Sequence, residues 1–123
     1  MATIKSFTDI SQSRKLAEIL PIESADMRYA PFGDTHPWVW DDNLLERGAI
    51  PCWSLAALLS VIPYDVSISR AVYRFKLVKF YDHWECYHEN FGRVSTEIFK
   101  AKEAIDAVYA MILELHELKL LLL

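Results

Sequence analysis

The fold is decided by residues 71–100, AVYRFKLVKFYDHWECYHENFGRVSTEIFK. Apolar and charged residues alternate over Tyr73–Leu77, which is typical of a strand with one packed face and one solvated face. A second alternating run, Trp84–Glu89, follows the polar segment Tyr81–His83. The pattern therefore predicts a β-hairpin that turns at Tyr81–His83.

The strands on either side of this hairpin show two further features. At Leu77 and Val78 the apolar phase slips by one residue, which predicts a β-bulge or a strong local twist. After the turn residues Asn90–Gly92, a third strand is expected over Val94–Lys100. Strands connected by such short turns form an antiparallel meander.

The clearest helix is predicted directly after the meander, over Lys102–Leu118. Its apolar stripe is formed by Ile105, Val108, Ile112 and Leu115. Acidic side chains lie mainly outside this stripe, so one face packs and the other meets water. The expected fold class is α+β, with a small antiparallel sheet of three strands and helices packed on one of its faces.

The N-terminal half is less regular. A helix is expected over Ser11–Leu20, capped by Thr8 or Asp9 and stopped by Pro21. Turn-forming residues are dense over 21–52, where only Met27–Ala30 has the composition of a strand.

A short apolar helix is expected next, over Trp53–Ile62, with Ser54 near its start and Pro63 after its end. The chain contains no repeat, linker or low-complexity segment, and 123 residues suit a single domain spanning 1–123.

Charge and cysteine content narrow the function classes. A formal net charge of −4 argues against binding to nucleic acid or to an anionic membrane surface. Cys52 and Cys86 lie too far apart for a CxxC motif and are expected as buried thiols in the cytoplasm. Charged residues interrupt the first 20 positions, so no export signal is expected, and the apolar run Leu55–Leu59 is too short to span a bilayer.

Three segments resemble one known family. They are KSFTDISQSRKLAEILPIESADM (5–27), PCWSLAALL (51–59) and AVYAMILELHEL (107–118). Together they make the chain similar to short, uncharacterised proteins encoded in prophages and mobile elements of gut Bacteroidetes. The resemblance implies this genomic context and does not imply an activity or a site.

The most unusual segment is DTHPWVWDD, residues 34–42, which presents His36, Trp38 and Trp40 on an expected loop. Exposed aromatic side chains on loops often form binding sites. The alternative is that both tryptophans fold back and cover an edge of the small core.

A metal or a nucleophile would have to come from His83, Cys86 and His88 or from a Cys–His pair. On a regular strand Cys86 and His88 face one way and His83 the other, so only two ligands converge. Inert packing is the expected role of Cys52 and Cys86. No catalytic residue, metal ion or cofactor is therefore expected, and His36, Trp38, Trp40, Cys86 and His88 remain candidate binding residues.

A local basic cluster lies at Arg70, Arg74, Lys76 and Lys79. The neighbouring aromatic residues fall mostly on the opposite strand face, and acids of the return strand are expected to pair with the cations. The sequence thus favours a solvated strand face over RNA binding.

These observations predict a non-enzymatic interaction protein of a phage or mobile element, which binds an unknown protein partner or a second copy of itself. The apolar segment Leu118–Leu123 is expected to contribute to a homodimer. The alternative is a small-ligand, metal-binding or catalytic pocket near residues 30–52, and the third hypothesis is a weak nucleic-acid binder.

Overall fold

The computed structural model describes residues 4–30, 37–39, 49–94 and 97–121. Its elements, in chain order, are α1 (Ile10–Ala17), the 3₁₀ turn η1 (Ile22–Ser24), β1 (Met27–Tyr29), β2 (Trp38–Val39), β3 (Ile50–Cys52), α2 (Leu55–Val61), β4 (Asp65–Ile68), β5 (Ala71–Lys79), β6 (Trp84–Asn90), β7 (Arg93–Val94), β8 (Phe99–Ala101) and α3 (Ala104–Glu117).

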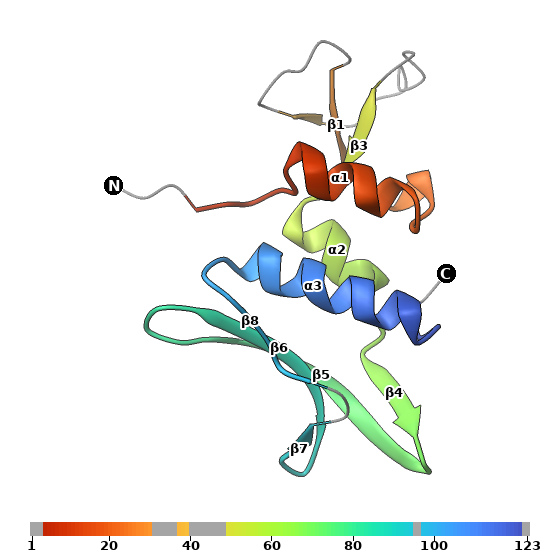
Figure 1. The fold of residues 1–123 in the computed structure, drawn as a ribbon, viewed down its shortest axis with the longest axis vertical. Helices are drawn as coiled ribbons and strands as arrows, with labels where there is room; N and C mark the ends of the chain where they lie inside the picture. Colours follow the sequence, from red (N-terminus) through yellow and green to blue (C-terminus); the bar gives the residue numbers. More distant parts are fainter. Residues whose placement is uncertain (1–3, 31–36, 40–48, 95–96, 122–123) are drawn as a thin grey trace.

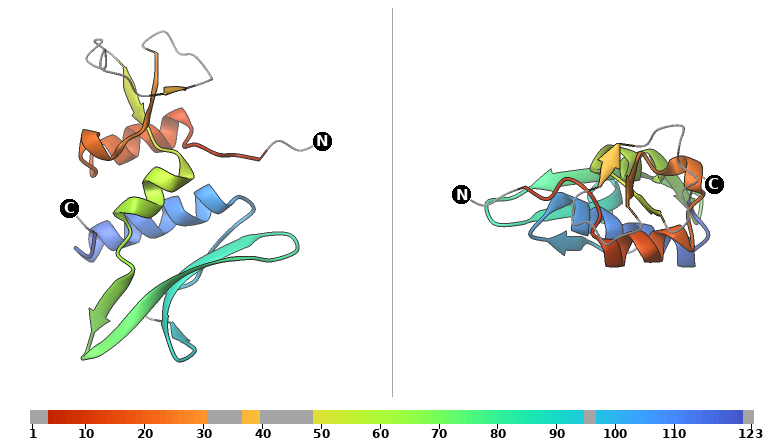
Figure 2. Two further views of the ribbon diagram at one scale, coloured as in Figure 1. Left: turned by 180° about the vertical axis from the view of Figure 1, so that it is seen from behind. Right: turned by 90° about the horizontal axis from the view of Figure 1, so that it is seen from above.

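The helices lie between two antiparallel sheets (Figures 1 and 2). The larger sheet has five strands in the order β4-β5-β6-β7, with β8 also paired to β6. The smaller sheet has the order β2-β1-β3 and lies beyond α1, at the opposite end of the molecule (Figure 1). The α+β class is confirmed, whereas the prediction of a single three-stranded meander is wrong in strand number and in missing the smaller sheet.

Both N-terminal helices begin at the expected caps. Asp9 accepts a hydrogen bond from the Gln12 backbone N–H at 2.8 Å, and the Gln12 side chain accepts one from the Asp9 N–H at 3.1 Å. This reciprocal capping box settles the choice between Thr8 and Asp9. Ser54 caps α2 by accepting from the Ala57 N–H at 3.2 Å.

The larger sheet is built from tight hairpins. Ser69 and Arg70 both have positive φ, at 51° and 70°, between the paired residues Ile68 and Ala71. Two consecutive positive φ values are the pattern of a type I′ turn, whose twist matches that of antiparallel strands. The turn connects β4 to β5.

The predicted bulge at Leu77 and Val78 is wrong. The register of β5 and β6 runs unbroken from Arg74 opposite Glu89 to Lys79 opposite Trp84. Val78 instead occupies an outer-face position opposite Glu85, where it is half-buried. The apolar Val78 on the outer face therefore looks in the sequence like a shift in the alternation, although the strand is regular.

The predicted third strand, Val94–Lys100, becomes the short strands β7 and β8. Both pair with β6 along the same edge, β7 near Asn90 and β8 near Trp84. The two short strands thus share one edge of β6, and with β4, β5 and β6 they make a sheet of five strands.

One hydrophobic core joins the helices to the inner face of the larger sheet. From α3 it takes Ile105, Ala107, Val108, Met111, Ile112 and Leu115. The helix ends in a Schellman motif, in which Lys119 has φ 58° and the Leu120 N–H donates to the Leu115 carbonyl at 2.9 Å. This turn directs Leu120 and Leu121 back against the core, so these two leucines of the expected dimer segment already have a partner within the chain.

Candidate functional site

Three of the five predicted site residues lie in the described part of the chain. Cys86 and His88 lie on the inner face of β6, whereas the backbone of Trp38 belongs to β2, on the far side of the helices (Figure 1). His36 and Trp40 fall outside the described residues. The structure therefore brings Cys86 and His88 together but separates them from Trp38.

Cys86 and His88 each hold the sheet to another element. The Cys86 thiol donates to the Ala107 carbonyl of α3 at 3.3 Å, and burial raises its pKa to about 12. His88 is 2% exposed and donates from Nε2 to the Pro63 carbonyl at 2.8 Å. Burial lowers the His88 pKa, so its ring is neutral. Both side chains thus have structural contacts and no access to solvent.

Cys52 belongs to a second buried group, the Thr8 cluster, formed by Thr8, Ser13, Tyr29 and Cys52. The Thr8 hydroxyl lies 2.8 Å from the Ser13 hydroxyl and accepts from the Trp53 N–H at 3.1 Å. The Tyr29 hydroxyl donates to the Thr8 carbonyl at 2.6 Å. These bonds anchor the N-terminal segment to the start of α2, and burial raises the Cys52 pKa, which keeps the thiol protonated and inert.

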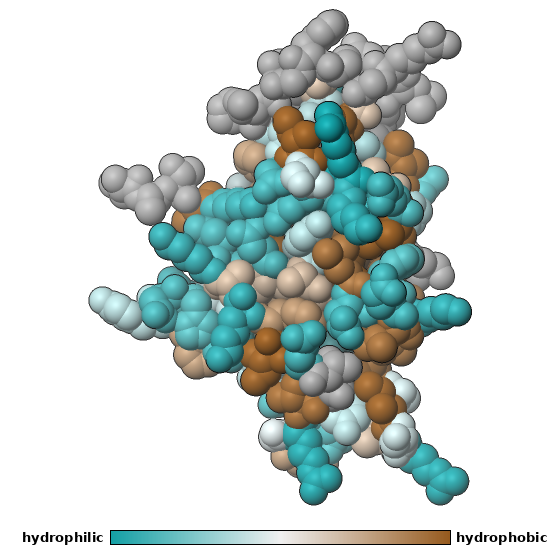
Figure 3. Space-filling view, viewed as in Figure 1, coloured by the Kyte–Doolittle hydropathy of each residue, from teal (hydrophilic) through white to brown (hydrophobic). Residues whose placement is uncertain are grey.

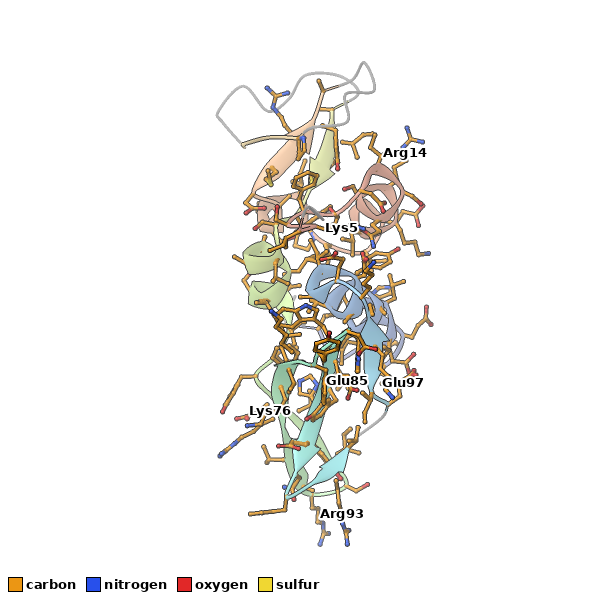
Figure 4. The ribbon with its side chains drawn as sticks, turned by 90° about the vertical axis from the view of Figure 1, so that its left-hand side faces the viewer. Lys5, Arg14, Lys76, Glu85, Arg93 and Glu97 are labelled. Carbon is orange, nitrogen blue, oxygen red and sulfur yellow. The ribbon has the colours of Figure 1, made fainter. Side chains whose placement is uncertain are left out.

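Arg74 and Lys76 lie on the outer face of β5, and Figure 4 shows Lys76 pointing away from the helices. Lys79 instead shares the strand phase of Leu77, and its ammonium lies 6.0 Å from the centre of the Trp84 ring. Arg74 lies opposite Glu89, but its ion pair among the described residues, at 3.7 Å, is with Asp65 of β4 and not with an acid of the return strand as expected.

His83, at the end of the β5–β6 hairpin, is held from both sides. Its Nδ1 lies 2.7 Å from Asp82 Oδ1, its Nε2 lies 2.7 Å from Glu85 Oε2, and its ring stacks on Phe80 with centroids 4.8 Å apart. The hydrogen bonds to Asp82 and Glu85 raise the His83 pKa. Because both of its ring nitrogens are hydrogen-bonded, His83 stabilises the end of the hairpin.

Among the residues that the structure describes, no three His, Cys, Asp or Glu side chains are placed to share a metal ion. Within the same part of the chain, no helix has the length and apolar character to cross a membrane.

A groove of about 280 Å³ crosses the outer face of α3. Its lining comes from α1 and the turn after it, from β8 and from α3: Lys15, Ile19, Phe99, Ala110, Leu113, Glu114, His116 and Glu117. Ala110 and Leu113 lie on the helix surface, and the small side chain of Ala110 leaves the hollow between Ile19 and Phe99. Figure 3 shows this side of the molecule, where apolar surface lies between the polar surfaces of α1 and α3.

The charges beside this α3 groove are Lys15 on the α1 side and Glu114 and Glu117 on the α3 side. Glu114 and Glu117 lie in the last turn of α3, where the helix dipole disfavours negative charge. Neither glutamate takes part in an ion pair among the described residues, while Lys15 lies 3.6 Å from Glu18. The groove therefore combines an apolar floor with unneutralised carboxylates.

The sequence did not predict this groove, because the expected apolar stripe of α3 does not include the residues on its floor. Tyr109, Ala110 and Leu113 lie outside that stripe and are only half-buried. Apolar residues on the second face of the helix were the available signal, since they indicate contact with something beyond the sheet.

Comparison of the chain with protein families, curated proteins and solved structures finds no match.

Proposed function

We propose that this chain is a non-enzymatic interaction protein of a phage or mobile element, and that it binds another protein through the α3 groove. The observation that carries the proposal is the half-buried apolar floor at Ala110 and Leu113, hollowed between Ile19 and Phe99. Apolar surface in a concave site favours a protein segment as its occupant. The mobile-element context rests on the resemblance of segments 5–27, 51–59 and 107–118.

The surroundings of the cysteine and histidine side chains support the same proposal. Cys52 and Cys86 are buried with raised pKa values, His88 is buried and neutral, and His83 has carboxylates on both nitrogens. A nucleophile needs a free base beside it and access to substrate. These four side chains instead make contacts that stabilise the fold.

The test is photo-crosslinking in cells that encode the protein. Leu113 is replaced by benzoylphenylalanine, and Val72, which is 44% exposed on the open face of the larger sheet, provides the matched control position. We expect a discrete crosslinked product from position 113, absent from position 72 and lost when Ala110→Trp fills the groove.

Absence of a product at position 113, or equal products at both positions, would contradict the proposal. Mass spectrometry of the product distinguishes a foreign partner from a second copy of the chain. A product of twice the chain mass would identify a homodimer, which is the alternative form of the same interaction.

A further inference from the structure

We infer that the α3 groove takes an amphipathic α-helix of another protein, with lysine or arginine residues beside its apolar face. This inference rests on the proposed function, because it names the partner chemistry of the same groove. It is carried by the shape of the groove, by its satisfied backbone and by the charge along its rim.

The backbone around the groove indicates a helical occupant. The last carbonyls of α3 are already bonded, with Leu118 N–H donating to Glu114 at 3.0 Å and Lys119 N–H donating to His116 at 3.0 Å. The α3 side of the groove therefore offers mainly side chains to an incoming chain. A helix satisfies its own peptide groups and suits such a surface, whereas an extended strand would have to pair with the edge of β8.

The length of the groove sets the size of the occupant. The α3 part of the lining runs from Ala110 to Glu117, which extends over roughly 12 Å at about 1.5 Å per residue. A partner helix of two to three turns would cover this distance and place apolar residues at i, i+3 and i+4 against Ala110 and Leu113.

The charge of the rim selects a basic partner. Glu114 and Glu117 lack ion-pair partners among the described residues, and both stand at the negative end of the α3 dipole. A lysine or arginine next to the apolar face of the partner would neutralise these carboxylates and the helix end together. Nucleic acid and anionic membranes carry the wrong sign for this rim.

The open face of the larger sheet is the competing surface. A shallow pocket there is lined by Val72, Arg74, Lys76, Glu89, Asn90 and Phe91. Phe91 is fully exposed and has φ 46°, which is an unusual backbone conformation for a bulky residue. Arg74 is already offset by Asp65 and Glu89, so this pocket favours no particular charge in a partner.

The experiment titrates the full chain with three 18-residue peptides and follows binding by fluorescence anisotropy at low salt. The first peptide places leucine and lysine at the spacing of an amphipathic helix, the second is a scramble of the first, and the third replaces lysine by glutamate. We expect the first peptide to bind at least roughly tenfold more tightly than either of the others.

Two variants locate the binding. Ala110→Trp fills the groove and is expected to weaken binding of the leucine–lysine peptide by at least about tenfold. The double variant Glu114→Gln/Glu117→Gln removes the rim charge and is expected to weaken it roughly fivefold. Glu23→Gln/Glu89→Gln makes the same change in net charge away from the groove and is the matched control, expected to stay within about twofold. Circular dichroism confirms that each variant is folded.

The outcomes separate the inference from the proposed function. If Ala110→Trp abolishes binding but the two double variants behave alike, the groove binds a helix and the preference for a basic partner is wrong. If the peptide does not bind, or Ala110→Trp leaves its affinity unchanged, the inference is overturned. The crosslink from position 113 in cells then decides the proposed function independently.

Discussion

The Thr8 cluster and the α3 groove differ in how the molecule treats polar groups. In the cluster, the hydroxyl of Thr8 is bonded to Ser13 and to the Trp53 N–H, and its carbonyl accepts from Tyr29. In the groove, Glu114 and Glu117 stand beside apolar surface with no ion pair among the described residues. The buried Thr8 cluster is polar and hydrogen-bonded, whereas the exposed α3 groove is partly apolar and carries carboxylates without an ion pair among the described residues.

Residue type alone therefore does not identify a site in this protein. Cysteine, histidine, tyrosine and threonine are the side chains usually sought as catalytic groups. Here they join segments that are distant in sequence, such as the N-terminal strand-like segment and the start of α2. The groove that we propose as a binding surface is instead lined mainly by aliphatic, aromatic and charged side chains.

The largest effect is expected from breaking the Thr8 cluster. Thr8→Val keeps the shape of the side chain but leaves the Trp53 N–H and the Ser13 hydroxyl without this partner in the interior. Each buried polar group left unpaired costs about 1–3 kcal/mol, so the free energy of unfolding should fall by about 2–4 kcal/mol. Urea denaturation measures the loss. Thr8→Ser, which keeps the hydroxyl, should lose clearly less, and equal losses would show that the hydroxyl is not the cause.

The second prediction concerns His88 and the pH dependence of stability. His88→Leu removes the donor to the Pro63 carbonyl and should cost about 1–3 kcal/mol at pH 7.5. The pKa of His88 in the folded protein is lowered below its ordinary 6.5. Below pH 6.5 the unfolded chain therefore binds a proton at His88 more readily than the folded protein does. Stability from neutral His88 is therefore present above pH 6.5 and declines below it, by up to about 1.4 kcal/mol per pH unit.

Urea denaturation of wild type and His88→Leu at pH 7.5 and 5.5 checks this sign. The difference between the two proteins should shrink at the lower pH. Comparison with the variant also separates His88 from His83, whose raised pKa gives stability at low pH that is lost as the pH rises through it. A difference that is the same at both pH values would show that His88 does not titrate as its burial requires.

The smallest effect is expected at the groove, and its sign is opposite. Glu114→Gln/Glu117→Gln removes two negative charges from the last turn of α3, which should raise the free energy of unfolding by up to about 1 kcal/mol. Thermal unfolding at low salt measures it. A loss of stability of similar size would mean that the glutamates support the fold, and their assignment to a binding surface would lose its main electrostatic argument.

Much of the fold follows from local patterns in the sequence. The alternation in β5 and β6, the caps at Asp9 and Ser54 and the apolar stripe of α3 predict these elements closely, because each depends on near neighbours in the chain. The smaller sheet is not predictable in this way. Its strand β2 has two residues, and β3 contains Pro51, so both depend on pairing with β1 for their conformation.

The site was less accessible to sequence reasoning. The expected burial of Cys52 and Cys86 agrees with their surroundings, whereas Lys79 has the opposite strand phase from Arg74 and Lys76 because the predicted bulge is absent. The groove depends on Ile19, Phe99 and Ala110, which are distant in sequence and meet only through packing. A second apolar face on α3 indicates a contact, but it does not reveal what flanks it.

Backbone amide chemical shifts of the ¹⁵N-labelled protein show whether the α3 groove receives a basic amphipathic helix, as we propose. During titration with the leucine–lysine peptide, we expect the shift changes to cluster at Ile19, Phe99, Ala110 and Leu113. Changes confined to Val72, Arg74 and Phe91 would place binding on the open face of the larger sheet and contradict the account.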